Sequence, residues 1–210
     1  MTSPQYAVLV PVKPPAHGKS RLVGPPADLR RDLAAAFALD TVAACLAARS
    51  VGEVLAVTDD AQFSRQLSSL GCTAIPDGVT GDLNATLRQA AAEVRRRWED
   101  LVPVAVCADL PALRPDDLDA ALAQASAHEA SFVADATGLG TTLYAATHDR
   151  FDPRFGLGSC LAHLGTGAVA IEGALTSLRR DVDDLEDLRE ALALGVGQHT
   201  SAAVTGAETQ

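Results

Sequence analysis

Short apolar runs alternate with longer amphipathic stretches along almost the whole chain of 210 residues. The apolar runs cover residues 6–12, 54–58, 73–76, 102–107, 131–134, 142–146 and 168–171. The amphipathic stretches cover residues 27–48, 61–70, 83–98, 114–127 and 185–194. Strands that alternate with helices of about ten or more residues form βαβ units. The pattern therefore predicts an α/β fold with a Rossmann-like, mixed but mostly parallel sheet flanked by helices.

Helix starts and one antiparallel strand can also be predicted. Asp60, Asp82 and Asp184 each stand directly before an amphipathic stretch, where a helix N-cap is expected. The apolar runs 131–134 and 142–146 follow one another with no helical stretch between them. This succession predicts an antiparallel strand, either inserted in the sheet or at its edge.

The length of the chain fits one domain, since typical domains run to roughly 100–200 residues. Hydrophobic residues make up 48% of the chain and aromatic residues only 4%, so the core must consist largely of Ala, Val and Leu. Residues 1–194 are expected to form this single domain. Residues 195–210 are small and polar, and they are expected to form a flexible C-terminal tail.

Net charge and cysteine spacing exclude several classes of protein. The formal net charge of −10 argues against non-specific binding to nucleic acid or to an anionic membrane, so neither partner is expected. The four cysteines are scattered and contain no C-x-x-C pair, so neither a disulfide framework nor a zinc site is predicted. The first residues lack the pattern of a signal peptide, and no apolar run approaches the roughly 18 residues that span a bilayer. We expect a cytoplasmic protein.

The loop after the first apolar run carries three cations, Lys13, Lys19 and Arg21. Ligands of open parallel sheets bind outside the carboxyl ends of the strands, so these cations are placed to hold a triphosphate. The alternative is a solvated loop whose cations have no ligand. Gly18-Lys19-Ser20 ends like a phosphate-binding loop, but Lys13 occupies the position of the first glycine, which argues against a Walker-type NTPase.

Three aspartates are candidates for a metal site. Asp109 directly follows an apolar run, and Asp181 and Asp183 are spaced so that both side chains point the same way in an extended chain. Converging carboxylates repel one another unless a cation lies between them, and Mg²⁺ prefers such oxygen ligands. The three acids therefore predict a site for one or two Mg²⁺ ions. The alternatives are that Asp109 caps a turn and that Asp183 or Asp184 caps the next helix.

Two glycine-containing segments, 138–142 and 155–160, could bring backbone amides and hydroxyls close to an anion. Ser159 is placed where a helix could begin, and helix N-termini favour anions. Neither segment has the G-x-S-x-G pattern of a serine hydrolase, and the alternative is that both are ordinary turns. The five histidines form no metal-ligand spacing, and surface or partly buried positions are expected for all of them: His17, His128, His148, His163 and His199.

Taken in order, these segments resemble the 2-phospho-L-lactate/phosphoenolpyruvate guanylyltransferases of deazaflavin coenzyme F420 biosynthesis. More distantly they resemble the transferases with the single-domain nucleotide-diphospho-sugar transferase fold. The resemblance runs from the first apolar run to the stretch 185–194. The matching residues are Lys13 with Lys19-Ser20-Arg21-Leu22, Asp77 with Leu83-Asn84, Ala108-Asp109-Leu110-Pro111, Ser131-Phe132-Val133-Ala134-Asp135, Gly138 with Gly140-Thr141, Arg154-Phe155-Gly156 with Ser159, and Asp181-Val182-Asp183.

The resemblance implies a role for each candidate residue. Asp109, Asp181 and Asp183 would be the ligands of Mg²⁺. Thr141, Gly156 and Ser159 would hold phosphoenolpyruvate. The catalytic cations Lys13, Lys19 and Arg21 would lie along the phosphates of GTP, and Asn84 near its nucleoside. The family usually has glycine where this chain has Ala108, which would restrict how closely a ligand approaches the backbone there.

The reaction implied is the transfer of GMP from GTP to phosphoenolpyruvate, giving enolpyruvoyl-2-diphospho-5'-guanosine and pyrophosphate. A phosphomonoester is already largely ionised near neutral pH, since its second pKa is about 6, so the attacking oxygen needs no general base. Whether the product is handed directly to the downstream transferase of the pathway stays open, and so does the oligomeric state, with a homodimer among the possibilities.

Other functions stay open at this point. 2-Phospho-L-lactate is an alternative acceptor, and a cytidylyl- or uridylyltransferase acting on another small phosphorylated compound is an alternative enzyme. A nucleotide-binding module without catalysis is a further alternative, although crowded acids without a cation would destabilise it. A Rossmann redox domain is disfavoured because no G-x-G-x-x-G follows the first apolar run.

Overall fold

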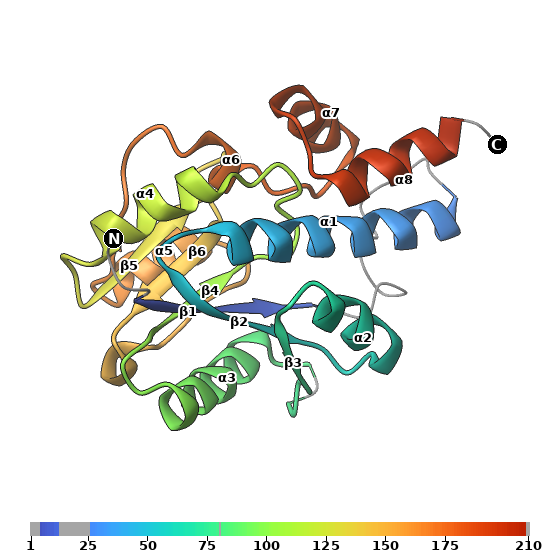
Figure 1. The fold of residues 1–210 in the computed structure, drawn as a ribbon. Helices are drawn as coiled ribbons and strands as arrows, with labels where there is room; N and C mark the ends of the chain where they lie inside the picture. Colours follow the sequence, from blue (N-terminus) through green and yellow to red (C-terminus); the bar gives the residue numbers. More distant parts are fainter. Residues whose placement is uncertain (1–4, 13–25, 80, 209–210) are drawn as a thin grey trace.

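The structure is a computed structural model that describes residues 5–12, 26–79 and 81–208. The strands of these residues form one sheet in the order β3-β2-β1-β4-β6-β5-β7 (Figure 1). Only β6 runs against its neighbours, β4 and β5, and the other pairs are parallel. The strands are β1 (Tyr6–Pro11), β2 (Val51–Val57), β3 (Thr73–Ile75), β4 (Val102–Val106), β5 (Ala130–Ala134), β6 (Thr141–Ala146) and β7 (Val169–Ala170).

Helices cover both faces of this sheet. They are α1 (Ala27–Ala47), α2 (Ala61–Ser69), α3 (Leu83–Arg97), α4 (Pro115–Ala125), α5 (Ser159–Gly165), α6 (Thr176–Arg179), α7 (Leu185–Leu194) and α8 (Gln198–Glu208), with the 3-10 helix η2 (His148–Arg150). Buried residues of α1, α2, α4 and α6 pack on one face, and those of α3 pack on the other. The predicted α/β fold with a mixed, mostly parallel sheet is confirmed.

Alternation of buried side chains along the central strands divides the core into two layers. In β1, Val8 and Val10 join the cluster under α1, whereas Ala7 and Leu9 join the cluster under α3. Strands covered on both faces read as continuous apolar runs, which is why β1 and β4 are so clear in the sequence. Among the described residues, no helix is both long and apolar enough to cross a membrane.

Sequence-based expectations about helix starts are confirmed. Asp60 accepts hydrogen bonds from the backbone N–H groups of Gln62 and Phe63 at the start of α2. Asp82 accepts one from Ala85 at the start of α3. Asp184 begins α7 with a reciprocal capping box, in which Asp187 accepts the N–H of Asp184.

The antiparallel pair predicted after residue 131 also exists, and β6 is inserted between β4 and β5 rather than placed at the edge of the sheet. Because β6 runs backwards, its first residue lies at the same edge as the last residues of β1, β4 and β5. We call this the carboxyl edge of the sheet. The chain segments after β4 and β5 and the start of β6 therefore meet there, where ligands of such folds bind.

The C-terminal segment differs from the sequence-based expectation of a flexible tail over residues 195–210. Residues 198–208 form α8, which lies along α1 (Figure 1). Asp40 of α1 is buried, and its carboxylate accepts the N–H groups of His199 at 3.0 Å and Thr200 at 2.8 Å. A long-range cap therefore starts this helix, and small residues such as Ala203 let it pack closely on α1.

We expect Asp40→Ala to lower the free energy of unfolding by about 1–2 kcal/mol, because two N–H groups at the start of α8 would lose their acceptor. Urea unfolding measures this change. Asp32→Ala, an exposed change on the same helix, is the matched control and should lie within about 0.5 kcal/mol of the wild type. Equal stabilities of the two variants would contradict a capping role for Asp40.

Candidate active site

Asp109, Asp181 and Asp183 are brought together at the carboxyl edge. Asp109 follows β4, and the N–H of Val182 donates to its backbone carbonyl at 3.0 Å. Val182 is fully buried against α1 and α7, so the backbone of this segment is held from both sides. The aspartates before and after Val182 consequently lie beside Asp109. This arrangement matches the predicted grouping of the three acids, while their role as metal ligands stays a prediction.

Asp135 is a fourth acid of this group that sequence reasoning did not assign a role. It follows β5, and its carboxylate accepts the N–H of Gly140 at 2.9 Å and the hydroxyl of Thr137 at 2.9 Å, which closes the turn into β6. Its position directly after an apolar run, like that of Asp109, is the signal that could have indicated it. We call Asp109, Asp135, Asp181 and Asp183 the acidic cluster.

Electrostatics in the acidic cluster are unfavourable for negative charge. Burial, together with the nearby charges of Asp109, Asp135 and Asp183, raises the pKa of Asp181 to about 7. A cation placed among these carboxylates would reverse both effects. Across residues 5–12, 26–79 and 81–208, no three His, Cys, Asp or Glu side chains are already arranged to hold a metal ion. A bound ion would therefore need further ligands, such as phosphate oxygens or water.

Two arginines directly before Asp181 hold the backbone around the acidic cluster. Arg179 donates to the carbonyl oxygens of Ala134 at 2.9 Å and Ile171 at 2.8 Å, and so ties the segment before Asp181 to the ends of β5 and β7. Arg180 forms ion pairs with Asp187 and Glu190 of α7. Both guanidinium groups are therefore engaged by groups of the protein itself. The predicted phosphate-binding cations Lys13, Lys19 and Arg21 lie outside the described residues.

Helix α1 holds the turn that carries Asp109. The hydroxyl of Thr41 is fully buried, accepts the N–H of Leu110 at 3.1 Å and donates to the carbonyl of Phe37 at 2.8 Å. The N–H of Gly197, directly before α8, donates to the carbonyl of Pro111 at 2.9 Å. Three segments that are distant in sequence thus fix the backbone around Asp109.

A second group of residues lies next to the acidic cluster, because the turn that Asp135 closes leads directly into Thr141. Thr141 begins β6, and its hydroxyl is 3.0 Å from Nδ1 of His163 on α5. Ser159 is the first residue of α5 and is buried. The N–H of Cys160 donates to the carbonyl of Leu139 at 3.1 Å, which links α5 to the same turn. The predicted acceptor-binding residues Thr141 and Ser159 are therefore joined through one short helix.

Gly156 stands at the entrance to α5 with a φ of 135°, a left-handed conformation that strongly favours glycine. Its carbonyl accepts the N–H of Ser159 at 3.1 Å, so this amide is used within the turn rather than left for an anion. The Ser159 hydroxyl, rather than this amide, is the predicted donor to the acceptor. We call Thr141, Gly156, Ser159 and His163 the β6–α5 cluster.

Asn84 has a structural partner that the sequence did not indicate. Its amide nitrogen donates to the carbonyl of Phe155 at 2.9 Å, and its amide oxygen accepts the N–H of the same residue at 2.8 Å. This reciprocal pair ties α3 to the segment before Gly156. The expected position of Asn84 near a nucleoside stays a prediction, and its side chain at least orients a segment of the β6–α5 cluster.

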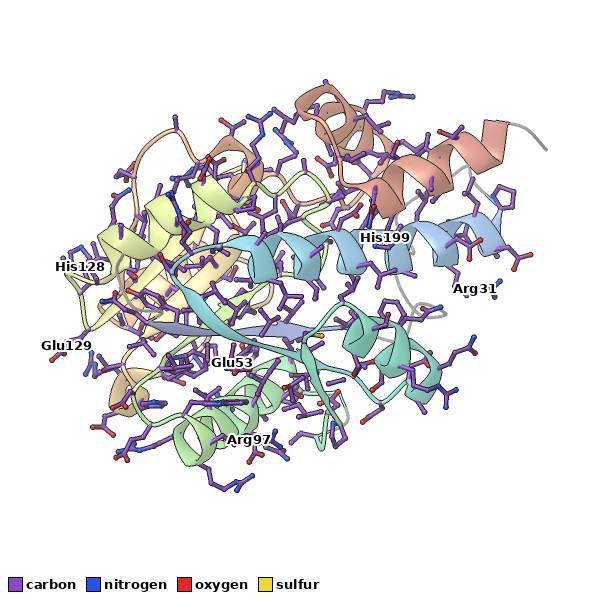
Figure 2. All side chains as sticks on the ribbon, in the orientation of Figure 1. Arg31, Glu53, Arg97, His128, Glu129 and His199 are labelled. Carbon is purple, nitrogen blue, oxygen red and sulfur yellow. The ribbon has the colours of Figure 1, made fainter. Side chains whose placement is uncertain are left out.

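His163 is fully buried, contrary to the surface or partly buried position expected for it. By contrast, Figure 2 shows His128 exposed at the other end of the sheet, just before β5 begins. The surface expectation rested on the absence of metal-ligand spacing, which says nothing about packing. A histidine surrounded by aromatic rings can be buried when both ring nitrogens have partners.

Comparison with known proteins identifies the family of the chain. Residues 6–204 match the family model described as "Guanylyl transferase CofC like". A protein of Streptomyces scabiei named phosphoenolpyruvate guanylyltransferase is 50% identical over 206 residues, with 95% of each chain covered. One of the same name from Thermomonospora curvata is 48% identical and covers 94% of this chain and 87% of its own.

Similarity to solved structures supports the fold. A putative nucleotide-diphospho-sugar transferase from Desulfovibrio desulfuricans G20 superposes with a TM-score of 0.62 at 18% identity, covering 91% of this chain and 96% of its own. At that identity the likeness shows the shared architecture alone. Together with the match over nearly the whole chain, these findings show that the chain belongs to the CofC-like guanylyl transferase family.

Proposed function

We propose that this chain is a phosphoenolpyruvate guanylyltransferase, which transfers GMP from GTP to phosphoenolpyruvate and releases pyrophosphate. Its family and the names of its relatives support this reaction. The observation that carries the proposal is that the acidic cluster adjoins the β6–α5 cluster at one edge of the sheet. Carboxylates suited to a cation thus lie next to hydroxyls suited to a small acid.

Each group has a distinct part in the proposed reaction. Asp109, Asp181 and Asp183 hold Mg²⁺, which when bound supplies positive charge to the phosphates of both substrates. Thr141 and Ser159 bind the carboxylate of phosphoenolpyruvate and so direct its phosphate toward the acidic cluster. The raised pKa of Asp181 fits a site that binds a cation, since the charged carboxylate is disfavoured until one is present.

The chemical step requires little from the protein beyond positioning. The phosphate oxygen of phosphoenolpyruvate attacks the α-phosphorus of GTP, the new P–O bond forms, and the bond to pyrophosphate breaks. Since the attacking oxygen is already ionised, no general base is needed. Lys13, Lys19 and Arg21 neutralise the phosphates of GTP and the departing pyrophosphate. The product then passes to the downstream transferase of coenzyme F420 biosynthesis.

Pyrophosphate release tests the proposal. We expect release by the purified protein with GTP, Mg²⁺ and phosphoenolpyruvate, and loss of release when EDTA removes the metal. ATP, CTP and UTP are the nucleotide controls, and 2-phospho-L-lactate and 3-phosphoglycerate are the acceptor controls. Release only with 2-phospho-L-lactate would keep the enzyme class and change the substrate. No release with any pair, even with the downstream transferase present, would contradict the proposal.

A further inference from the structure

His163, a member of the β6–α5 cluster, is enclosed by three aromatic rings. Its ring centroid is 4.6 Å from that of Tyr144 and 5.6 Å from that of Phe132, both in stacked geometry, and Phe155 meets its ring edge-on at 5.4 Å. The residue has no exposed surface. Burial lowers the pKa of His163 to about 4, so the ring is neutral at physiological pH.

Hydrogen bonds determine which ring nitrogen carries the proton. The backbone N–H of Arg154 lies 2.9 Å from Nε2 of His163. A backbone N–H can only donate, so Nε2 must be the unprotonated acceptor. The single proton of the neutral ring is then on Nδ1, which lies 3.0 Å from the hydroxyl oxygen of Thr141. His163 therefore donates to Thr141, and the backbone carbonyl of Ser159 is a second acceptor near the ring.

This direction has a consequence for the hydroxyl of Thr141. An oxygen that accepts the ring N–H keeps its own proton available, and that proton must be donated away from the ring. A hydroxyl that accepts one hydrogen bond also becomes a somewhat stronger donor in the next. Thr141 lies at the carboxyl edge, beside the turn that Asp135 closes. The hydroxyl is therefore a donor suited to an anionic oxygen of a ligand at this edge.

The same ring connects two segments of the site. Nε2 holds the backbone of Arg154, and the next residue, Phe155, is held by Asn84. Gly156 and Ser159 follow directly. One imidazole thus fixes Thr141 through one nitrogen and the approach to Gly156 through the other. A phenylalanine could fill the same space but could make neither hydrogen bond.

We propose that His163 is a positioning residue that orients the hydroxyl of Thr141 as a hydrogen-bond donor to the carboxylate of the acceptor acid. This inference rests on the proposed function. His163 takes no part in proton transfer to the substrate, because the attacking phosphate oxygen needs none. Its effect on the binding of the acceptor acts through the hydroxyl of Thr141, while the backbone contacts at Arg154 and Ser159 hold the ring in place.

The protonation state can be tested without any substrate. We expect the ¹⁵N NMR resonances of the His163 ring to show the neutral form with the proton on Nδ1 at pH 7. An assignment of the proton to Nε2, or a protonated ring at pH 7, would overturn the proposal. Since this measurement needs no turnover, it separates a failure of the inference from a failure of the proposed function.

Kinetic variants test the effect on the acceptor. His163→Phe keeps the ring stacking and removes both hydrogen bonds, so we expect the KM for phosphoenolpyruvate to rise about 10- to 100-fold. The KM for GTP should change less than about threefold. His163→Asn places an amide N–H near the position of Nδ1 and should recover most of the loss. His128→Phe, an exposed change at the opposite end of β5, is the matched control.

A double variant separates positioning from general structural damage. If His163 acts through Thr141, His163→Phe should add little to the acceptor KM of Thr141→Val. The proposal would be overturned if the two substitutions raised the KM for phosphoenolpyruvate independently, so that their effects multiply in the double variant. It would also be overturned if His163→Phe raised the KM for GTP as much as the KM for phosphoenolpyruvate. If His163→Phe fails to fold, the ring tautomer of the wild type still decides the direction of the hydrogen bond.

Discussion

Asp109→Asn is expected to lower kcat for guanylyl transfer by about 10²- to 10³-fold, with the free energy of unfolding changed by less than about 1 kcal/mol. The amide has the shape of the carboxylate but no negative charge, so it is a much weaker partner for a divalent cation. The turn should survive because its backbone is held independently, through Val182 and through the hydroxyl of Thr41. Steady-state pyrophosphate release and urea unfolding measure the two quantities.

Asp116→Asn is the matched control for this change. Asp116 lies on α4 with a largely exposed side chain, and its ion pair with Arg49 is at the surface, so its loss should matter little. We expect kcat within about twofold of the wild type for this variant. Undiminished turnover of Asp109→Asn at saturating Mg²⁺ would refute the assignment of Asp109 as a metal ligand.

Asp181→Asn is expected to abolish most activity and yet to stabilise the metal-free protein at pH 8. The pKa of Asp181 is raised to about 7, so between its usual value and pH 7 the folded protein binds a proton that the unfolded chain has lost. This group therefore stabilises the fold at low pH, and that stability disappears as the pH rises through about 7. The stability lost over this pH range is at most about 4 kcal/mol. Asparagine does not ionise, so it removes this pH dependence.

Urea unfolding in EDTA at pH 5 and pH 8 tests this expectation. The quantity of interest is the stability of Asp181→Asn relative to the wild type, since other groups, His163 among them, titrate in both proteins and cancel in the difference. This difference should grow in favour of the variant as the pH rises. Asp100→Asn, an exposed change, is the control and should show no such trend.

Addition of Mg²⁺ tests independently whether Asp181 is a metal ligand. A ligand that binds only the folded state stabilises it, by about 2.7 kcal/mol at a concentration one hundred times Kd. We expect Mg²⁺ at pH 8 to stabilise the wild type and to have little effect on Asp181→Asn. A stability difference that is independent of pH, together with equal responses to Mg²⁺, would show that Asp181 carries no unfavourable charge in the folded protein.

Much of the site could be predicted because its signals are local. Asp109 follows an apolar run and precedes Pro111, and Asp181 and Asp183 alternate about one buried residue. Such patterns depend only on the geometry of strands and turns. The helix caps Asp60, Asp82 and Asp184 were found for the same reason, since each acts within three residues of itself.

Other parts of the site have no local signal. Asn84 pairs with Phe155 across 71 positions, and Thr141 pairs with His163 across 22. Nothing near Asn84 in the sequence indicates that both ends of its amide are used by one distant backbone. Asp135 is an intermediate case, because its position after a strand was visible but the turn that it closes was not.

Local patterns in the sequence predict the alternation of strands and helices, the starts of the major helices and the three acids at the carboxyl edge. These follow from hydrophobic periodicity and capping, which act over a few residues. Three features follow from the packed fold instead: Asp40 caps α8 across 160 positions, His163 is buried, and its ring orients the hydroxyl of Thr141. Those outcomes depend on which groups become neighbours in the packed core. Burial forces each polar group to find a partner there, wherever in the chain that partner lies.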